Sequence, residues 1–240
     1  QRQMCIRDSA STPVKGTPIA RLSAFVNEVE THSPFRKKML PEVSAMFTAL
    51  APYAGFGMKL VFGNLWLFGP LLKAVMPSLS AQAGAMLKTT IAFTVQKGSD
   101  AYNVLPQEAY VGANMRFIPH QGEKESLEII KKVADKYGLE TEVLHANDYT
   151  PPVDIHGEAF HLVEQTIADT FPGLPSSPYV MTGATDAQFY QPICKSCIRF
   201  APVIYGPEQM KGMHGLNENI EYNCLPGAVR FYKNLIRAEK

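Results

Sequence analysis

The chain has 240 residues, of which 46% are hydrophobic and 19% charged, and its formal net charge at pH 7 is +1. These proportions are those of an ordinary globular protein and exclude a disordered chain. So small a net charge gives no electrostatic basis for binding nucleic acid or an anionic membrane, so we expect no nucleic-acid partner, and composition gives no reason to expect membrane contact. Four cysteines are too few for a disulfide scaffold in a chain of this length.

The first nine residues do not read as the start of a folded domain. Residues 1–9 contain no apolar core of a signal peptide, and no capping pattern leads from them into the next segment of the chain. We interpret this segment as a non-native scar of the kind left by adapters or read assembly. On that interpretation the native sequence upstream of Ala10 is missing.

The first helix is expected to begin at Pro18. Thr17 before it is a good cap, because its hydroxyl can accept a hydrogen bond from the first turn, and proline suits the first helical position. Apolar residues then recur at helical spacing until His32. They are Leu22, Phe25, Val26 and Val29. Residues 35–88 are apolar and interrupted by Met, Pro and Gly, and they predict two or three helices in an insertion packed on something larger.

Within this insertion, the stretch from Leu60 to Leu72 is uncharged and is bounded by Lys59 and Lys73. A helix that spans a membrane needs about 20 apolar residues, so this stretch is too short. It predicts a buried or interface helix. Contact with a membrane surface is the alternative interpretation.

The next elements form a helix-and-strand pattern. Residues 89–98 alternate in polarity, with Ile91, Phe93 and Val95 on one face, and residues 109–117 alternate in the same way. A helix is expected over residues 123–137, and a third short strand over residues 140–145. With the first helix, this order predicts a small α+β sandwich in which two helices cover one side of a sheet.

Pro151 and Pro152 mark a boundary, after which the pattern changes. Helices are predicted over residues 157–170 and 225–238, and two short apolar runs lie between them. The runs are residues 179–182 and 197–200. This alternation is typical of the end of a doubly wound α/β domain.

Few side chains are spaced for metal chemistry. A two-metal hydrolase needs several His, Asp and Glu ligands and a general base. The sequence contains no H-x-D stretch, no Asp-Asp pair and no Glu-Glu pair, so a complete site cannot be built from it. His156 and His161 are five apart, which turns them away from each other on a helix. Cys194 and Cys197 form a lone C-x-x-C, interpreted as two partly buried thiols, with a redox pair as the alternative.

Two stretches stand apart from this background: MTGATDA at residues 181–187 and HGLNE at residues 214–218. Together they resemble the closing motifs of the co-catalytic zinc exopeptidases and aminoacylases, which include glutamate carboxypeptidase, desuccinylase and aminoacylase. The resemblance implies that His214 is the last zinc ligand of a site that holds two zinc ions when intact. It also implies that Thr185 and Asp186 lie beside the metal and that Asn217 and Glu218 orient the loop or face the substrate.

The resemblance extends to the first part of the chain. The stretch NVLP at residues 103–106 and Arg116 match segments that approach the substrate in the family. It implies that Asn103 hydrogen-bonds near the scissile group and that Arg116 binds a carboxylate, which suits the planar guanidinium. The alternatives are a turn cap for Asn103 and a sheet-face ion pair for Arg116. Gln188 stands where relatives often have arginine.

The apolar insertion most resembles the carboxypeptidase S and Gly-Xaa carboxypeptidase branch, whose relatives include enzymes acting on N-fatty-acyl amino acids. The fold this implies is α/β: residues 151–240 would be the C-terminal part of a doubly wound zinc-peptidase domain. Residues 10–150 would be an inserted α+β, ferredoxin-like lid or dimerisation domain, with an apolar helical insertion at about residues 32–88.

The resemblance implies a fragment of a zinc-dependent carboxypeptidase or N-acyl-amino-acid amidohydrolase that hydrolyses an amide next to a free carboxylate. The expected partners are a small peptide or N-acyl amino acid as substrate and a second copy of the chain bound through the lid. We expect the fragment to be inactive, because the upstream ligands and base are missing. The alternative is a non-catalytic dimerisation or binding module.

Overall fold

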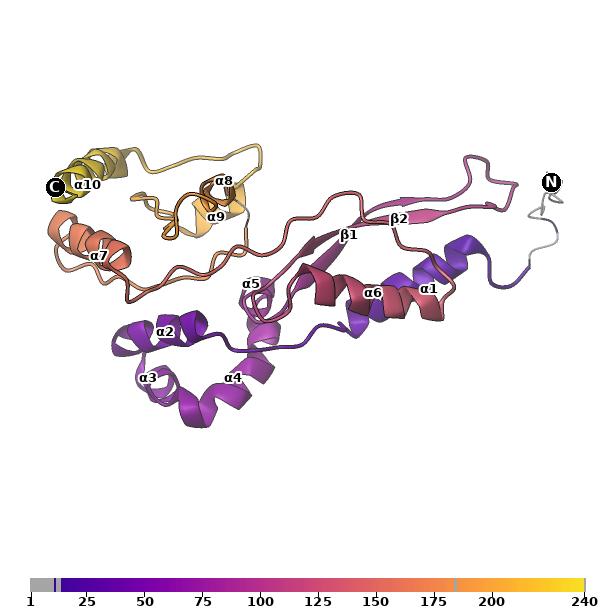
Figure 1. Ribbon diagram of the computed structural model, residues 1–240, viewed down its shortest axis with the longest axis horizontal. Coiled ribbons are helices and arrows are strands. Elements are labelled where there is room, and N and C mark those ends of the chain that lie inside the picture. The colour runs from indigo at the N-terminus through magenta and orange to yellow at the C-terminus, as the bar shows by residue number, and fades with distance from the viewer. Residues whose placement is uncertain (1–10, 12–13, 184, 240) are drawn as a thin grey trace. The chain divides into compact units, whose positions relative to one another are not determined.

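A computed structural model of the chain describes residues 11, 14–183 and 185–239 (Figure 1). The interpretation of residues 1–9 as a scar lies outside the described residues. The chain mixes helices with strands, as expected for an α/β protein, and divides into two compact units. Unit 1 comprises the described residues up to Leu40 and Gly69–Tyr149, and unit 2 comprises Pro41–Phe68 and the described residues from Thr150 onward.

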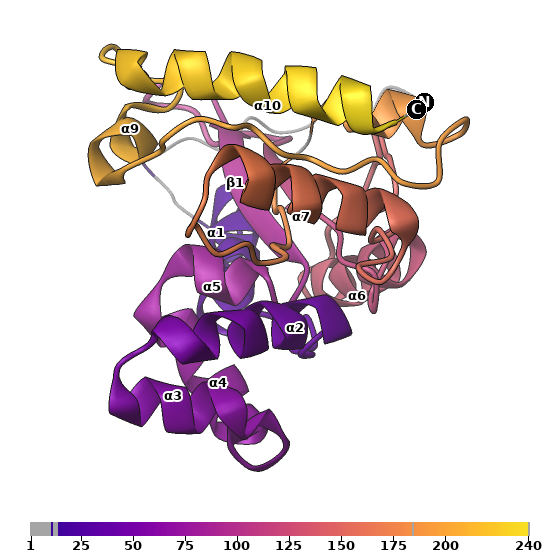
Figure 2. The ribbon, with the colours of Figure 1, turned by 90° about the vertical axis from the view of Figure 1, so that its left-hand side faces the viewer.

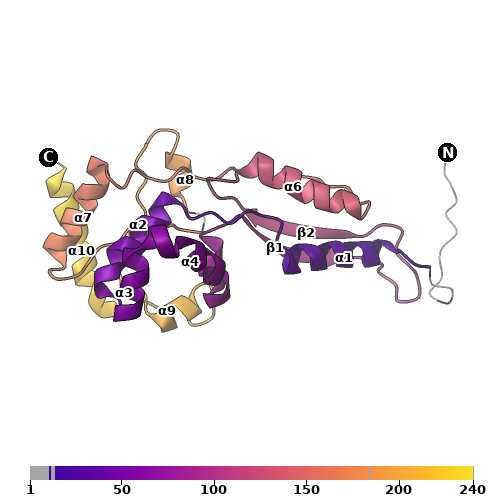
Figure 3. The ribbon, with the colours of Figure 1, turned by 90° about the horizontal axis from the view of Figure 1, so that it is seen from below.

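Unit 1 is built on a two-stranded antiparallel sheet of β1 (Thr90–Lys97) and β2 (Tyr110–Arg116). Helices α1 (Pro18–Thr31) and α6 (Glu123–Lys136) run along the same side of it (Figures 1 and 3). The predicted start of α1 is confirmed, because the Thr17 hydroxyl accepts a hydrogen bond from the Ala20 N–H at 3.3 Å.

The core of unit 1 lies between these helices and the sheet. Its buried members are Phe25, Val29, Phe35, Ile130, Val133 and Ala134, with Ile91, Phe93, Val111 and Met115 packed against them. The Phe25 ring meets the edge of Phe93 with centroids 5.7 Å apart. Burying each large apolar side chain stabilises the fold by about 1.5–3 kcal/mol. The prediction of two helices on one side of a sheet is confirmed.

The prediction for Val95 is wrong, since this side chain is exposed rather than aligned with Phe93. Phe93 pairs with Ala113 and Val95 with Gly112, so β1 has one extra residue between them. Such a β-bulge moves every later side chain to the opposite face. Gly112 makes room for the displaced valine, because a Cβ there would lie 3.3 Å from the Val95 Cβ.

The third strand predicted at residues 140–145 is also wrong. These residues form no strand, and their apolar members Val143 and Leu144 are exposed. Among the described residues the sheet contains β1 and β2 alone. Alternating polarity favours a strand only where a neighbour pairs with its backbone, and residues 140–145 have no such neighbour.

Helices α1 and α6 are also joined by a polar contact. The Glu28 carboxylate accepts hydrogen bonds from the Lys136 ammonium at 2.6 Å and from the Tyr137 hydroxyl at 2.5 Å. The Lys136 hydrogen bond, and then that of Tyr137, lowers the pKa of Glu28, while the same contact raises the pKa of Tyr137. A depressed carboxyl pKa stabilises the fold above its unfolded value, and this contribution is lost as the pH falls through the folded value.

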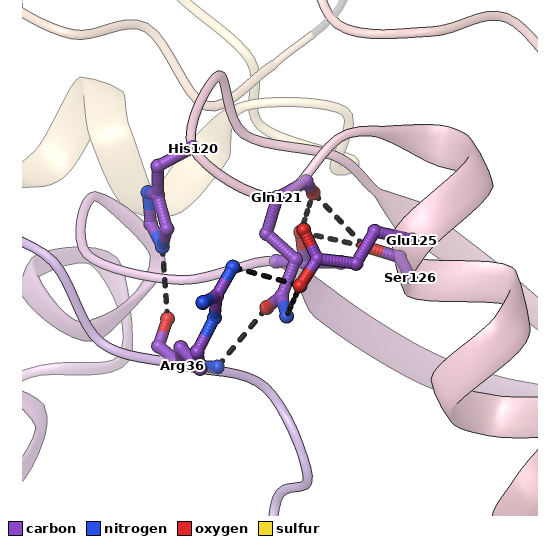
Figure 4. A network of polar contacts seen from close by, with 6 residues as sticks. Arg36, His120, Gln121, Glu125 and Ser126 are labelled. Carbon is purple, nitrogen blue, oxygen red and sulfur yellow. Dashed lines mark hydrogen bonds and ion pairs between the residues drawn. The ribbon is translucent and has the colours of Figure 1, made fainter.

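A polar network centred on the buried Gln121 lies at the N-terminal end of α6 (Figure 4). The fully buried Gln121 accepts a hydrogen bond from the Arg36 N–H at 3.0 Å and donates to Glu125 at 3.4 Å. The Gln121 carbonyl accepts from the hydroxyls of Thr89 and Ser126, both at 2.9 Å. Gln121 therefore joins the segment after α1, the start of β1 and the first turn of α6.

We expect Gln121→Met to destabilise the chain by about 1–3 kcal/mol, because the Arg36 N–H would lose its acceptor within this network. Urea denaturation would measure the change in the free energy of unfolding. Gln107→Met, the same substitution at an exposed position, is the matched control and should change it by less than about 0.5 kcal/mol. Equal effects of the two substitutions would contradict the role given to the network.

Residues 41–85 form more helices than the two or three predicted. They are α2 (Pro41–Leu50), the 3-10 turn η1 (Ala51–Tyr53), α3 (Phe56–Gly63), α4 (Leu65–Leu79) and α5 (Ala81–Ala85). Asn64 separates α3 from α4, and its side-chain amide caps α3 by donating to the Leu60 carbonyl at 2.9 Å. The boundary between the two units falls within α4, after Phe68.

The buried or interface helix predicted at residues 60–72 is divided between α3 and α4, and most of its side chains are not buried, while the interface stays a prediction. Trp66 is 81% exposed, and Leu60, Leu67 and Leu71 are exposed with it, whereas Leu72 is buried. Among the described residues no single helix is long and apolar enough to cross a membrane. Helices α3 and α4 together meet that test of length and composition, but the chain bends by 109° between them.

Unit 2 contains α7 (Glu158–Thr170), α8 (Ala187–Tyr190), α9 (Pro207–Gly212), the 3-10 turn η2 (Tyr222–Cys224) and α10 (Leu225–Ala238). Helices α7 and α10 pack side by side (Figure 2). Asn234 on α10 donates to the Thr170 hydroxyl on α7 at 3.0 Å. The apolar runs at residues 179–182 and 197–200 lie outside helices and strands. The doubly wound sheet therefore stays a prediction for the protein that contains this chain.

Candidate functional site

The loop after α9 holds His214 in an unusual backbone conformation. Its φ is 59°, which is the only positive φ among the described non-glycine residues. The left-handed region costs about 1–3 kcal/mol for such a residue and persists where the surrounding loop enforces it. Here the His214 N–H donates to the Glu218 carboxylate at 3.3 Å, and the Gly215 N–H donates to the Gly212 carbonyl at 2.8 Å. The imidazole itself is exposed.

Gln209, which the sequence patterns did not indicate, holds the residues that follow the HGLNE stretch. Gln209 is buried, and its amide donates to the side chains of Asn219 at 3.2 Å and Glu221 at 3.4 Å. Its side-chain oxygen accepts from the Gly206 N–H at 3.0 Å, which also caps α9. Glutamine at the third position of a helix is a capping signal that could have identified it.

Two further predicted site residues lie in this loop. Glu218 hydrogen-bonds the backbone of His214, and the Asn217 carbonyl accepts from the Asn219 amide at 2.8 Å. The loop also depends on Gly212, because a Cβ there would lie 2.8 Å from the Asn217 carbonyl oxygen. Glu218 thus orients the backbone that carries His214, while a substrate contact by either residue stays a prediction.

Thr185 and Asp186 form a second loop, at the start of α8. The Thr185 carbonyl accepts from the Gln188 N–H at 3.2 Å, and the Asp186 carbonyl accepts from the Phe189 N–H at 3.0 Å. The Asp186 side chain is exposed and makes no capping hydrogen bond to α8.

Arg199 positions this second loop, and the sequence reasoning missed it. Its Nε donates to the Thr185 hydroxyl at 2.9 Å. The adjacent Phe200 ring packs on Phe231 of α10, with centroids 4.8 Å apart. A lone charge inside the apolar run 197–200 was the signal available in the sequence. Arg199 therefore connects the Thr185 loop to the α10 core.

The two thiols beside Arg199 are free. Cys197 is half-buried and donates to the Cys194 carbonyl at 3.4 Å, whereas Cys194 is exposed, so the prediction of two partly buried thiols holds only for Cys197. Burial, and then the neighbouring Cys194 thiol, raises the pKa of Cys197. A raised pKa keeps this thiol protonated at neutral pH, where it is a poor nucleophile and a poor metal ligand.

The predicted substrate residues of unit 1 are exposed but lie far from each other. Arg116 pairs with Thr90 at one end of the hairpin, and the loop that carries Asn103 joins Lys97 to Tyr110 at the other end. At about 3.3 Å per residue, the seven residues of β2 separate these ends by roughly 20 Å. Asn103 and Arg116 of one chain therefore cannot contact the same small substrate.

The alternative roles for these two residues find no support in the described part of the chain. Arg116 forms no ion pair with another described residue, and the Asn103 side chain caps no turn there. Both side chains are thus available to a ligand or a partner. Their contact with substrate stays a prediction.

The described residues do not form a metal site on their own. No group of three or more His, Cys, Asp and Glu side chains among them could hold a metal ion. A zinc site takes three or four protein ligands, and the predicted set contributes His214 alone. The residues present therefore do not fit a resident zinc ion without ligands from elsewhere.

Comparison with known proteins identifies the class. Residues 23–238 match peptidase family M20/M25/M40, and the chain belongs to this family. Over 236 residues it is 32% identical to the N-fatty-acyl-amino acid synthase/hydrolase PM20D1 of Xenopus tropicalis, covering 95% of this chain and 44% of the relative. It is 31% identical over 232 residues to the human protein of the same name, covering 95% and 46%.

More distant relatives extend the range of activities. The chain is 25% identical over 229 residues to a probable carboxypeptidase S-like 2 of Dictyostelium discoideum, covering 95% of this chain and 44% of the relative. It is 27% identical over 154 residues to a succinyl-diaminopimelate desuccinylase of Xanthomonas oryzae, covering 59% and 36%. The predicted family and branch are confirmed. The chain spans less than half the length of these relatives. No solved structure matches it.

Proposed function

We propose that the protein containing this chain is a zinc-dependent amidohydrolase that cleaves an amide next to a free carboxylate. The observation that carries the proposal is the HGLNE loop, which holds the exposed His214 at a positive φ within a chain of the M20/M25/M40 family. His214 would supply one zinc ligand, and the remaining ligands and the general base would come from upstream. Zinc would polarise the scissile carbonyl when bound.

The substrate class that best fits is N-acyl amino acids with an apolar acyl group. Two relatives are named N-fatty-acyl-amino acid synthase/hydrolases, and this chain carries an apolar helical segment at residues 56–79. In the full-length protein, kcat/KM should rise with acyl chain length. Each added CH₂ that is buried contributes about 0.8 kcal/mol, or roughly fourfold. Indifference to chain length, with turnover of short peptides such as Gly-Leu, would favour a carboxypeptidase instead.

We propose that the isolated chain is inactive and binds zinc weakly. The single predicted ligand supports this, as do the exposed apolar side chains of α10, among them Val229 and Ile236, which suit a helix that packs on a sheet. Elemental analysis after dialysis against zinc should find much less than one zinc per chain. One or two zinc ions per chain, with hydrolysis of Gly-Leu, would refute the proposal.

The separation of Asn103 and Arg116 supports a homodimer in which the two residues of one chain serve different active sites. Mixing inactive Asn103→Ala and Arg116→Ala variants of the full-length protein tests this. A heterodimer would then hold one site with both residues intact, so random reassociation should restore about a quarter of the wild-type activity. No recovery after verified subunit exchange would show that both residues act in one site.

Arg199 is predicted to be a positioning residue for the Thr185 loop. Arg199→Gln in the full-length protein should lower kcat/KM by about 10–100-fold, the range for residues that orient a metal site from outside it. Arg237→Gln, at the exposed end of α10, is the matched control and should leave kcat/KM unchanged. If Arg199→Gln instead lowers the melting temperature and leaves kcat/KM unchanged, Arg199 contributes to folding alone.

A further inference from the structure

The 3-10 turn η1, helix α3 and the first turn of α4 carry an exposed apolar surface within unit 2. We name it the 53–67 surface, and it consists of Tyr53, Phe56, Met58, Leu60, Trp66 and Leu67. Phe56 is 88% exposed and Trp66 is 81% exposed. Single exposed apolar residues are common, but a cluster of this kind in consecutive turns marks an interaction site.

The fold explains why these side chains stay outside the core. Helix α3 packs on α2 through one side only, where the Phe62 ring lies 4.8 Å from the Phe47 ring. Asn64 then ends α3, and the chain turns by 109° into α4. The other sides of the short α3 helix, with Phe56, Met58 and Leu60, and the first turn of α4, with Trp66, therefore remain uncovered among the described residues.

The part of unit 2 that carries this surface is one-sided in charge. Residues 43–68 contain no acidic residue, and Lys59 is the one charged residue among them. Lys59 lies on α3, within the 53–67 surface, and is exposed. The net charge of +1 for the whole chain does not reveal this local positive charge, which is why composition predicted no affinity for an anionic surface.

We propose that the 53–67 surface docks on anionic phospholipid membranes. Tryptophan and tyrosine favour the headgroup level of a bilayer, leucine and phenylalanine the acyl boundary below it, and lysine the lipid phosphates. Each lysine near an anionic surface contributes about a fivefold increase in binding. A protein partner or a second copy would also cover apolar residues, but residues 43–68 carry a lysine and no carboxylate, which favours lipid. The proposal is independent of any catalytic activity.

The chain provides its own reporter, because Trp66 is its one tryptophan. With vesicles of phosphatidylcholine and phosphatidylserine, Trp66 fluorescence should shift to the blue and be quenched by brominated lipid. Vesicles of phosphatidylcholine alone should bind at least about fivefold more weakly, and added salt should reduce the difference. Lys59→Glu should weaken binding to the anionic vesicles by at least about fivefold. Lys131→Glu, at an exposed position on α6, is the matched control.

A double variant tests the apolar part of the surface. Phe56→Ser with Leu67→Ser should reduce vesicle binding by more than about tenfold, while Tyr102→Ser, at an exposed loop position, should not. Circular dichroism would confirm that each variant folds.

Four results would overturn the proposal. They are no blue shift with anionic vesicles, the same shift caused by raising the protein concentration without lipid, the same shift with dissolved N-acyl amino acid monomers, and no vesicle binding by the full-length protein. The second result would indicate a contact between copies, the third a substrate site, and the fourth a surface covered by the rest of the protein.

Discussion

His214→Ala in the full-length protein is expected to abolish stable zinc binding at one of the two proposed sites and to lower kcat/KM by more than about a hundredfold. Substituting a residue that merely orients a metal ligand typically costs about 10–100-fold, so losing the ligand itself should cost more. The loss should appear both in the zinc content after dialysis and in the hydrolysis of an N-acyl amino acid. The exposed imidazole makes few contacts within the chain, so folding should be unaffected.

Two further variants distinguish the loss of a zinc ligand from a change in the backbone conformation of the loop. His214→Gly should be as inactive as His214→Ala but no less stable to heat, because glycine adopts the φ of 59° without strain. His161→Ala removes another exposed histidine, which pairs with Glu164 on α7, and should retain both zinc and activity. Full activity of His214→Gly would refute the assignment of His214 as a ligand.

Helices with local start and stop signals were predictable from the sequence. Helix α1 begins at the Thr17 cap and ends at His32, and α6 ends before Gly138, whose φ of 61° suits glycine. Caps and helical periodicity depend on residues within a few turns, so tertiary contacts do not have to be known.

The features that were mispredicted depend on distant partners. Val95 faces outward because of a bulge that only the pairing with β2 defines, and residues 140–145 lack a strand to pair with. The apolar run around Trp66 suggested a buried or interface helix, but apolar composition does not reveal whether another element covers a helix.

The candidate site likewise combines residues found from local motifs with residues whose role depends on distant contacts. His214, Thr185 and Asp186 were found because they lie in contiguous motifs that resemble a known family. Arg199 and Gln209 were missed, although each holds one of these loops in place. Their contacts with Thr185 and Asn219 reach 14 and 10 residues along the chain, so the local signals at Arg199 and Gln209 do not reveal these contacts.

Phe231→Ala is expected to have the largest effect on stability, about 3–5 kcal/mol, because truncating a buried phenylalanine removes apolar contacts and leaves a cavity. Phe231 is 2% exposed, packs on Phe200 and meets the edge of the Tyr232 ring with centroids 5.4 Å apart. Few large side chains in unit 2 are buried to this extent. Since whole domains are stable by about 5–15 kcal/mol, this loss should melt the α7–α10 pair at moderate urea concentrations.

Hydrogen exchange would locate the effect of Phe231→Ala. Amides of α7 and α10 should lose protection at lower urea concentrations than in the wild type, while those of α1 and α6 in the separate core of unit 1 should keep theirs. Ile236→Ala, at an exposed position of the same helix, is the matched control and should cost less than about 0.5 kcal/mol. Equal losses of protection in both units, or equal costs for the two substitutions, would contradict a separate core around Phe231. Because Phe200 follows Arg199, loss of this packing should also weaken the hydrogen bond from Arg199 to Thr185. Phe231→Ala should therefore lower the free energy of unfolding and disturb the Thr185 loop together.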